Sequence, residues 1–456
     1  MIETNPLGYE KIGKLILRFS APAIASNLLN AVYNIVDQIF IGHGIGYDGI
    51  AATNIAFPLV TITTAVSILI GVGCAANFSL NLGAGNKEKA ARFAGNGLAI
   101  MLLCGVCISL ISILFLSPLL RLFGANDEIM GLATDYTFIV SLGIPFQVVT
   151  LGLSNLIRAD GSPNRAMLSM TSGAVFNLIF DPIFMFTFGW GIKGIAWATT
   201  LGQVLSASIA LVYYFCGMKT VRLSKTDFLP DIARVKAICV LGTAGFVNQI
   251  ALTLMTIVLN NTLKYYGEMS KYGSTITLGA VGATTKINII FLACCVGLGQ
   301  GCQPINGFNY GAGNYVRVKR TLQLSLIGAI IISAAFFLAF QLLPREILAI
   351  FGEGSAEYFE FGTRYLRIFM FMTFANWAQP MVAGYFTSTG RASLGVMISI
   401  TRQILFLIPL LIILPLKYGI DGVVFAGPIA DSAAAALGVV FFIREFRRLN
   451  RLIRDV

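Results

Sequence analysis

The sequence predicts an all-α membrane protein with about twelve transmembrane helices, arranged as two related halves. This prediction depends on long apolar runs, a scarcity of charged residues, and a motif that occurs twice. Of the 456 residues, 56% are hydrophobic and only 12% are charged, whereas about a quarter of the residues of a soluble domain are charged. The composition therefore excludes an ordinary water-soluble domain.

The apolar residues come in runs that are long enough to cross a bilayer. Residues 98–120 and 324–343 contain no charged residue at all. About 20 apolar residues in a helix cross roughly 30 Å of hydrocarbon, and a helix satisfies its own backbone polar groups there. The predicted spans are residues 15–41, 52–80, 94–118, 132–157, 166–188, 194–216, 237–262, 276–305, 320–343, 361–387, 394–415 and 420–443.

Basic residues are concentrated on one side of these predicted spans. The net charge is +11, and 22 of the 32 Lys and Arg residues lie at the two ends of the chain or in loops that follow every second span. Since loops rich in Lys and Arg remain in the cytoplasm, both termini are predicted to be cytoplasmic. The basic charge is thus explained by membrane topology, and we expect no nucleic-acid partner. We also expect the first apolar run to remain as a span, because it is too long for a cleaved signal peptide.

A repeated motif shows that the chain contains a duplication. Residues 70–86 (IGVGCAANFSLNLGAGN) and 298–314 (LGQGCQPINGFNYGAGN) share GxGC and NxGAGN at the same spacing, 228 residues apart. The same distance separates Gly191 from Gly419. Because each half holds an even number of spans, we expect two six-helix lobes related by an axis along the membrane normal, around a central cavity. The predicted units are residues 1–216, a cytoplasmic linker at 217–236, and residues 237–456.

The repeated NxGAGN motif is expected to end a span. Glycine adopts positive φ without steric cost, which is the conformation that closes many helices. The simplest interpretation is a cytoplasmic turn that both halves inherited.

Polar side chains form a stripe on the first predicted span. Asn27, Asn30, Asn34 and Asp37 follow one another at spacings of 3, 4 and 3 residues, which places them on one helical face. Such a stripe either joins helices through hydrogen bonds or lines a water-filled cavity. We favour the cavity, because a carboxylate in mid-span is costly unless water or a partner reaches it.

A second carboxylate occurs in the fifth predicted span. Asp181 follows Asn177 by four residues, so both lie on one face of the helix. Pro182 cannot donate to the helix and crowds the carbonyl of Leu178, so we expect a kink that frees carbonyl oxygen for a cation. The alternative is a helix bend with a solvated Asp181 near the membrane boundary.

The second half lacks corresponding acids. The residue 228 positions after Asp181 is Pro409, and alignment of the first span with the seventh places Leu259 opposite Asp37. Since both halves share one architecture, packing does not explain this difference. We therefore predict that the first half carries ion coupling.

The second half has other polar residues within its predicted spans. Lys286 either pairs with a carboxylate across the cavity or extends toward the membrane surface, and Asp431 is interpreted as structural. The residues expected to line the substrate cavity are Asn27, Asn30, Asn34, Gln147, Lys286 and Asn376.

Motifs for other chemistry do not occur in the sequence. GxxxxGK[ST], HExxH and GxSxG are absent, so neither a P-loop ATPase nor these hydrolases are indicated. The eight Cys lie in or beside apolar spans, where they are interpreted as core residues, and a single His does not allow a His/Cys metal site. We expect no enzyme and no cofactor.

The whole chain resembles the multidrug and toxic compound extrusion (MATE) family, most closely its DinF-like bacterial branch. The resemblance depends on twelve spans in two halves, the paired NxGAGN motifs, PAIASNLLNAVYNIVD at 22–37 and NLIFDP at 177–182. It implies a first-half cation-coupling pocket made of Tyr33, Asp37, Tyr136, Asn177, Asp181 and Thr199. Another branch uses acids in spans seven and ten, where this chain has none and carries Asn376 instead.

The resemblance also implies a function. Members of this family export amphipathic, often cationic drugs in exchange for H⁺ or Na⁺, and this implies a monomer surrounded by lipid in the bacterial cytoplasmic membrane. A carboxyl group in apolar surroundings favours its protonated form, whereas Na⁺ would bind at Asp37, Asn177, Asp181 and Thr199. The alternative is a flippase for lipid-linked saccharides, which would favour basic residues for phosphate in its cavity; only Lys286 qualifies.

Overall fold

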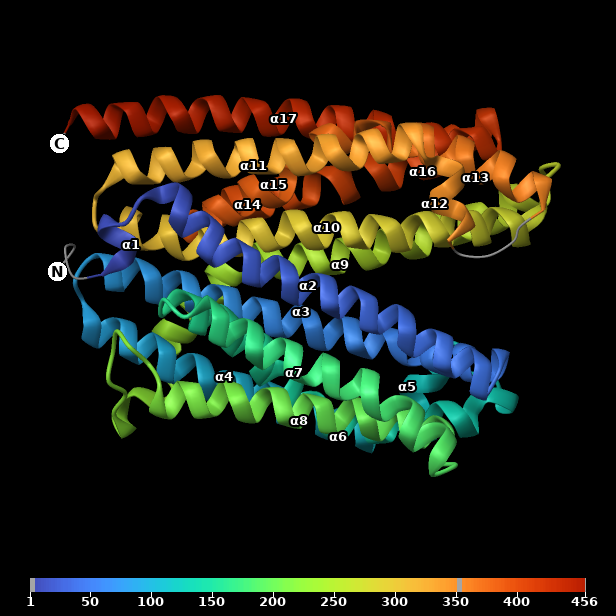
Figure 1. Cartoon of the computed structure of the whole chain (residues 1–456), viewed down its shortest axis with the longest axis horizontal. Coiled ribbons are helices and arrows are strands. Elements are labelled where there is room, and N and C mark those ends of the chain that lie inside the picture. Colours follow the sequence, from blue (N-terminus) through green and yellow to red (C-terminus); the bar gives the residue numbers. More distant parts are fainter. Residues whose placement is uncertain (1–4, 351–354, 456) are drawn as a thin grey trace.

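The computed structural model describes residues 5–350 and 355–455, and every regular element in them is helical (Figure 1). The first half contains α1 (Pro6–Tyr9), α2 (Ile12–Gly44), α3 (Tyr47–Gly83), α4 (Lys87–Leu114), α5 (Leu116–Leu122), α6 (Asp127–Ala159), α7 (Pro163–Pro182), η2 (Ile183–Thr187) and α8 (Ile192–Cys216). The connection and the second half contain η3 (Lys225–Phe228), α9 (Ile232–Glu268), α10 (Gly273–Gly311), α11 (Tyr315–Leu342), α12 (Pro344–Ala349), α13 (Ala356–Phe369), η4 (Phe371–Ala375), α14 (Ala378–Ser388), α15 (Ala392–Ile400), η5 (Thr401–Leu407), α16 (Ile408–Tyr418) and α17 (Ile420–Arg454).

Eleven helical segments of the described residues are long and apolar enough to cross a membrane. Their outer faces carry large apolar side chains, among them Leu103 on α4, Val212 on α8 and Ile331 on α11, which are each more than 60% exposed. Exposing so many large apolar side chains to water is unfavourable, whereas contact with the hydrocarbon of a membrane is favourable. The chain is a multi-pass membrane protein, as predicted.

The predicted tenth span, residues 361–387, is not one continuous helix. It consists of α13, the 3₁₀ turn η4 and α14, which together run from one end of the bundle toward the other (Figure 1). Pro380 has no N–H to donate to the carbonyl of Asn376, and its ring crowds that carbonyl, so the regular helix is weakened at this point. The twelfth crossing therefore exists in an interrupted form.

The two halves form two bodies that lie side by side (Figure 1). Helices α2 to α8 make one body and α9 to α17 the other, and α2 and α3 pack against α10 and α9 where the bodies meet. Both chain termini lie at the same end of the bundle, which we call the terminus end. The two-lobed, all-helical architecture predicted from the duplication is confirmed.

Each NxGAGN motif forms the turn that was predicted. The second glycines of the two motifs, Gly85 and Gly313, have φ of +82° and +71° and lie two residues after the ends of α3 and α10. An L-residue with a side chain is strained in this conformation, so glycine is needed there.

The first glycine of each motif makes a contact that the sequence interpretation did not include. A Cβ placed on Gly83 would lie 1.9 Å from the backbone oxygen of Phe308, and a Cβ on Gly311 would lie 2.1 Å from that of Leu80. Each residue of one contact is 228 positions from its counterpart in the other, so the two contacts are related by the pseudo-symmetry of the halves. The halves thus meet backbone to backbone at the terminus end.

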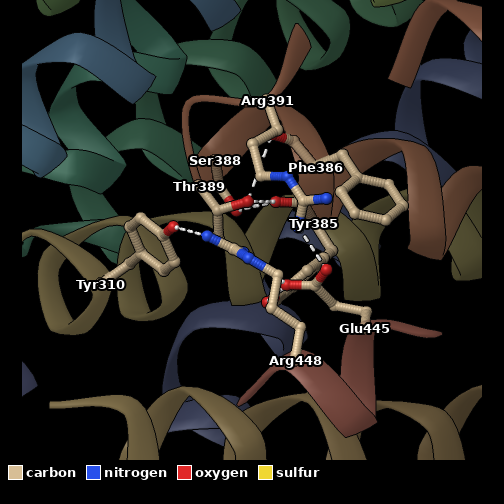
Figure 2. A network of polar contacts seen from close by, with 8 residues as sticks. All are labelled: Tyr310, Tyr385, Phe386, Ser388, Thr389, Arg391, Glu445 and Arg448. Atoms are coloured by element: carbon tan, nitrogen blue, oxygen red, sulfur yellow. Dashed lines mark hydrogen bonds and ion pairs between the residues drawn. The ribbon is translucent and has the colours of Figure 1, made fainter. Parts of the chain in front are cut away.

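A buried polar cluster holds the last helix at the terminus end of the second half (Figure 2). Glu445 on α17 is 3% exposed, pairs with Arg391 and Arg448, and accepts a hydrogen bond of 3.0 Å from the Tyr385 hydroxyl. Arg448 also donates to the hydroxyl of Tyr310 on α10 at 2.7 Å. Because two arginines compensate the buried carboxylate of Glu445, the cluster fixes α17 against α10 and the α14–α15 turn.

The α-helical pattern changes at Pro182, the residue where a kink was predicted. The α-helical pattern of α7 ends at this residue and continues as the π-helical turn η2. In the second half a π-helical segment, η5, likewise separates α15 from α16. Such turns inside α-helices frequently occur at functional sites.

Candidate functional site

The two carboxyl groups predicted from the sequence meet inside the first half. Asp37 lies on α2 and Asp181 on the last turn of α7, and they are 9% and 1% exposed. Their side chains lie close enough to interact electrostatically. Two adjacent carboxylates repel, so one of them is more stable with a proton or a neighbouring cation.

Asn177 and Thr199 connect this carboxyl pair to α8. With its amide oriented to satisfy both neighbours, Asn177 donates to Asp181 Oδ2 at 2.7 Å. Its oxygen accepts from the backbone N–H of Thr199 at 3.1 Å and from the Thr199 hydroxyl at 3.0 Å. The i−4 spacing predicted that Asn177 and Asp181 share a face, and the structure shows that they also share a hydrogen bond.

Two tyrosines complete the cluster. Tyr33 on α2 and Tyr136 on α6 both lie close enough to Asp37 and Asp181 to interact with them electrostatically. The fold therefore brings together all six residues that the family resemblance implied, from α2, α6, α7 and α8.

A cavity of about 110 Å³ lies beside this cluster. Ligand pockets for drug-sized molecules are about 300–1,000 Å³, whereas each water takes about 30 Å³. The cavity therefore has room for an ion with a few waters and not for a drug. Its lining residues are Asn30, Tyr33, Gln147, Thr150, Leu151, Met170, Gly173, Ala174, Asn177, Thr199, Gly202, Gln203 and Ser206.

Three buried oxygens at this site have no hydrogen-bond partner within the protein. They are Asp37 Oδ1, Thr150 Oγ1 and Gln203 Oε1. Leaving such an atom unsatisfied costs about 1–3 kcal/mol. Thr150 and Gln203 line the cavity, so their unsatisfied oxygens suit a site that water or a cation completes. Sequence reasoning missed Thr150, which lies one helical turn after the predicted Gln147, and did not assign Gln203 to the site.

The structure divides the predicted asparagine stripe among three roles. Asn30 lines the cavity. Asn27 donates to Gln300 Oε1 on α10 at 3.3 Å, so it joins the two halves as interhelical hydrogen bonding would. Asn34 is exposed and donates to the backbone oxygen of Asn30 at 2.7 Å. One helical face thus contacts different surroundings along its length.

Two of the predicted cavity residues lie elsewhere in the second half. Asn376 donates to Asp431 Oδ2 at 2.9 Å. Lys286 is exposed on α10 and does not line the first-half cavity. The side chains grouped as one substrate cavity therefore lie in separate places, because the two halves diverge away from their contact at the terminus end (Figure 1).

The predicted difference in acidity between the halves is present in the structure. Leu259, the counterpart of Asp37, is 6% exposed and belongs to an apolar cluster with Leu263, Leu407 and Leu411. No group of three or more His, Cys, Asp and Glu that could hold a metal occurs in residues 5–350 and 355–455. The buried oxygens of the first half are therefore the candidate cation ligands.

Comparison with known families bears directly on this arrangement. The MatE family model matches residues 22–183 and 241–413, one segment in each half. The chain belongs to the MatE family. Members of this family are transporters and not enzymes, so the resemblance noted from the sequence is confirmed.

Individual relatives match the MatE chain over nearly its whole length. It is 25% identical to the multidrug export protein MepA of Staphylococcus aureus (strain MSSA476) over 434 residues, which cover 95% of this chain and 94% of MepA. It is 24% identical to MepA of Staphylococcus haemolyticus (strain JCSC1435) over 444 residues, with 97% and 95% covered.

Solved structures show the same fold. The MATE multidrug transporter DinF-BH, solved as a complex with a ligand, is 34% identical, with a TM-score of 0.87 and 94% and 95% of the two chains covered. A MATE structure in complex with MaL6 has a TM-score of 0.91 at 23% identity, with 98% and 99% covered. These comparisons make this chain a MATE multidrug-transporter homologue.

Proposed function

We propose that this MatE protein is an antiporter that exports amphipathic, often cationic molecules in exchange for H⁺ or Na⁺ at the Asp37–Asp181 pair. The observation that carries the proposal is the buried carboxyl pair beside a small polar cavity with unsatisfied oxygens. A site of this size takes an ion with a few waters, and we place the drug outside it.

The chemistry of the pair supports either ion. A proton shared by Asp37 and Asp181 relieves the repulsion between their carboxylates. Na⁺ would instead take oxygens from Asp37, Asp181 and Thr199, with Asn177 Oδ1 within the same cluster. Entry of one positive charge gains about 2.3 kcal/mol per 100 mV of membrane potential, so the potential favours export only when more positive charge enters than leaves.

The proposed orientation places the terminus end in the cytoplasm of a bacterium. The concentration of Lys and Arg in the terminal segments and adjoining loops supports it through the positive-inside rule. In this orientation the contacts of Gly83 and Gly311 close the cytoplasmic side. Both six-helix bodies belong to one chain, which supports function as a monomer surrounded by lipid.

The relatives support a broad substrate class. MepA is named as a multidrug export protein, and DinF-BH is named as a multidrug transporter. We propose small amphipathic cations as substrates of this chain.

Transport in reconstituted vesicles tests the antiport. We expect ethidium movement to follow an imposed proton gradient or an imposed sodium gradient, and the ion that drives it is the coupling ion. A tenfold gradient stores about 1.4 kcal/mol, so one-for-one electroneutral exchange supports an ethidium gradient of about tenfold. An ionophore that dissipates the driving gradient is the control, and ethidium movement that ignores both gradients would contradict the proposal.

A further inference from the structure

The last helix of the chain, α17, carries four arginines on one side beyond its apolar part. They are Arg444, Arg447, Arg451 and Arg454, which we call the arginine stripe. Their spacings of 3, 4 and 3 residues keep them on one face of an α-helix. All four are exposed, and none forms an ion pair or a side-chain hydrogen bond within residues 5–350 and 355–455. The stripe therefore presents positive charge that these parts of the protein do not neutralise.

The opposite side of the same stretch is bound to the protein (Figure 2). Glu445 and Leu449 are 3% and 0% exposed. Arg448 pairs with Glu445 and donates to the Tyr310 hydroxyl. Arg448 thus faces the protein and has an acidic partner, whereas the arginine stripe faces outward without one. The packing on the inner side holds the stripe in a fixed direction.

The arginine stripe continues the lipid-facing side of α17. Leu437 and Val440 lie seven and four residues before Arg444, which places them on the same face, and both are exposed. α17 runs along the outer edge of the second half and ends at the terminus end (Figure 1). Residues 432–443 contain no charged residue, so Arg444 marks the end of the apolar part. The stripe thus begins where the hydrocarbon ends, on the side of the helix that lipid covers.

Depth along the helix divides the arginine stripe into two pairs. With a rise of about 1.5 Å per residue, Arg447 lies about 4.5 Å beyond Arg444 along the helix axis. The outer two arginines lie about 10 and 15 Å beyond Arg444, whereas the headgroup layer of one leaflet is about 5–8 Å thick. Arg444 and Arg447 therefore lie at headgroup depth, and the outer two extend into water. Asp455, which directly follows Arg454, offsets part of the outer charge.

We propose that Arg444 and Arg447 bind the headgroup of an anionic phospholipid in the leaflet at the terminus end. Each guanidinium presents N–H donors in a planar fork that matches phosphate oxygens. Arginine at this depth also attracts lipids of net negative charge in preference to zwitterionic ones. The outer pair adds a longer-range attraction, which salt screens. This lipid site depends neither on the coupling ion nor on the exported molecule, so failure of the antiport would leave it unaffected.

Quenching of tryptophan fluorescence by brominated lipids measures which lipid lies beside the arginine stripe. The full chain carries Val440→Trp, and its natural tryptophans Trp190, Trp197 and Trp377 are replaced by Phe. Vesicles of phosphatidylcholine contain a fraction of brominated phosphatidylglycerol or of brominated phosphatidylcholine. Because each arginine near the surface contributes a factor of about five, we expect phosphatidylglycerol to associate about 25-fold more strongly than phosphatidylcholine.

Paired substitutions on the same face are the matched controls. Arg444→Gln/Arg447→Gln should remove most of the preference for phosphatidylglycerol. Arg451→Gln/Arg454→Gln removes the same number of charges and should retain most of it, because these residues lie beyond the headgroups. Arg444→Lys/Arg447→Lys should keep a preference, since the positive charges remain. Equal quenching by the two lipids in the chain with all four arginines, or an equal loss from the inner and outer pairs, overturns the proposal.

Two further measurements keep the proposal testable. Raising the salt concentration from 0.01 M to 1 M shortens the Debye length from about 30 Å to about 3 Å, so the preference should fall; a preference that salt does not change would show that charge does not select the lipid. If Val440→Trp does not fold, the chain with its natural tryptophans should melt at a higher temperature with phosphatidylglycerol than with phosphatidylcholine, because the ligand binds the folded state. Arg444→Gln/Arg447→Gln should lose this difference, and its persistence would contradict the assignment.

Discussion

Replacing Asp37 by Asn is expected to reduce ion-driven ethidium transport to the level of vesicles without protein. The amide keeps the shape of the carboxyl group but neither releases a proton at physiological pH nor supplies negative charge to Na⁺. Asp181, the contact partner of Asp37, would then lack the second carboxyl group of the pair. Gradient-driven transport by Asp37→Asn at the wild-type rate would contradict the coupling role.

The controls for this prediction separate coupling from folding. Asp135 forms an exposed ion pair with Lys193 at 3.2 Å, and exposed pairs contribute about 0–1 kcal/mol, so Asp135→Asn should transport like the wild type. Asp37→Asn should also retain ethidium binding, measured on purified protein, because the cavity near Asp37 is too small for the drug. Loss of both binding and folding in this variant would point to a structural role.

The double substitution Gly83→Ala/Gly311→Ala is expected to abolish transport by preventing closure at the terminus end. The added Cβ atoms would lie 1.9 and 2.1 Å from backbone oxygens of the other half, so the two helices must separate. Alanine is about 1 kcal/mol better than glycine inside a helix. A loss of transport would therefore come from the contact between the halves and not from weaker helices.

Accessibility of Cys302 measures this separation. Cys302 on α10 is 3% exposed and its side chain contacts Ser20 of α2, across the junction between the halves. In a chain that retains Cys302 as its only cysteine, the double substitution should increase labelling by a water-soluble maleimide applied from the terminus end.

The matched control lies on the same helix. A Cβ on Gly282 of α10 would meet no atom within 4 Å, so Gly282→Ala should change neither Cys302 labelling nor transport. If the double substitution behaved like Gly282→Ala, the glycine contacts would not control closure.

Much of the fold could be predicted from the sequence because its signals are local or repeated. An apolar run specifies a span by its length alone, and helical periodicity places Asn177 beside Asp181 without knowledge of any other helix. Because of the duplication, a prediction made for one half also applies to the other, as the matching turns of Gly85 and Gly313 show. The break near Pro380 was not predicted, although proline gave a signal there.

The sequence by itself determined the number of spans, their grouping into halves, and the presence of Asp37 and Asp181 in the first half without acidic counterparts in the second. Only the tertiary structure decided that Asn27 joins the halves, that Gly83 and Gly311 carry their contact, and that Arg402 pairs with Asp431. The physical reason is that a helical repeat fixes which face a residue occupies, whereas the neighbour on that face comes from a distant part of the chain. Asp37 and Asp181 meet, and Arg402 and Asp431 pair, because packing brings separate helices together.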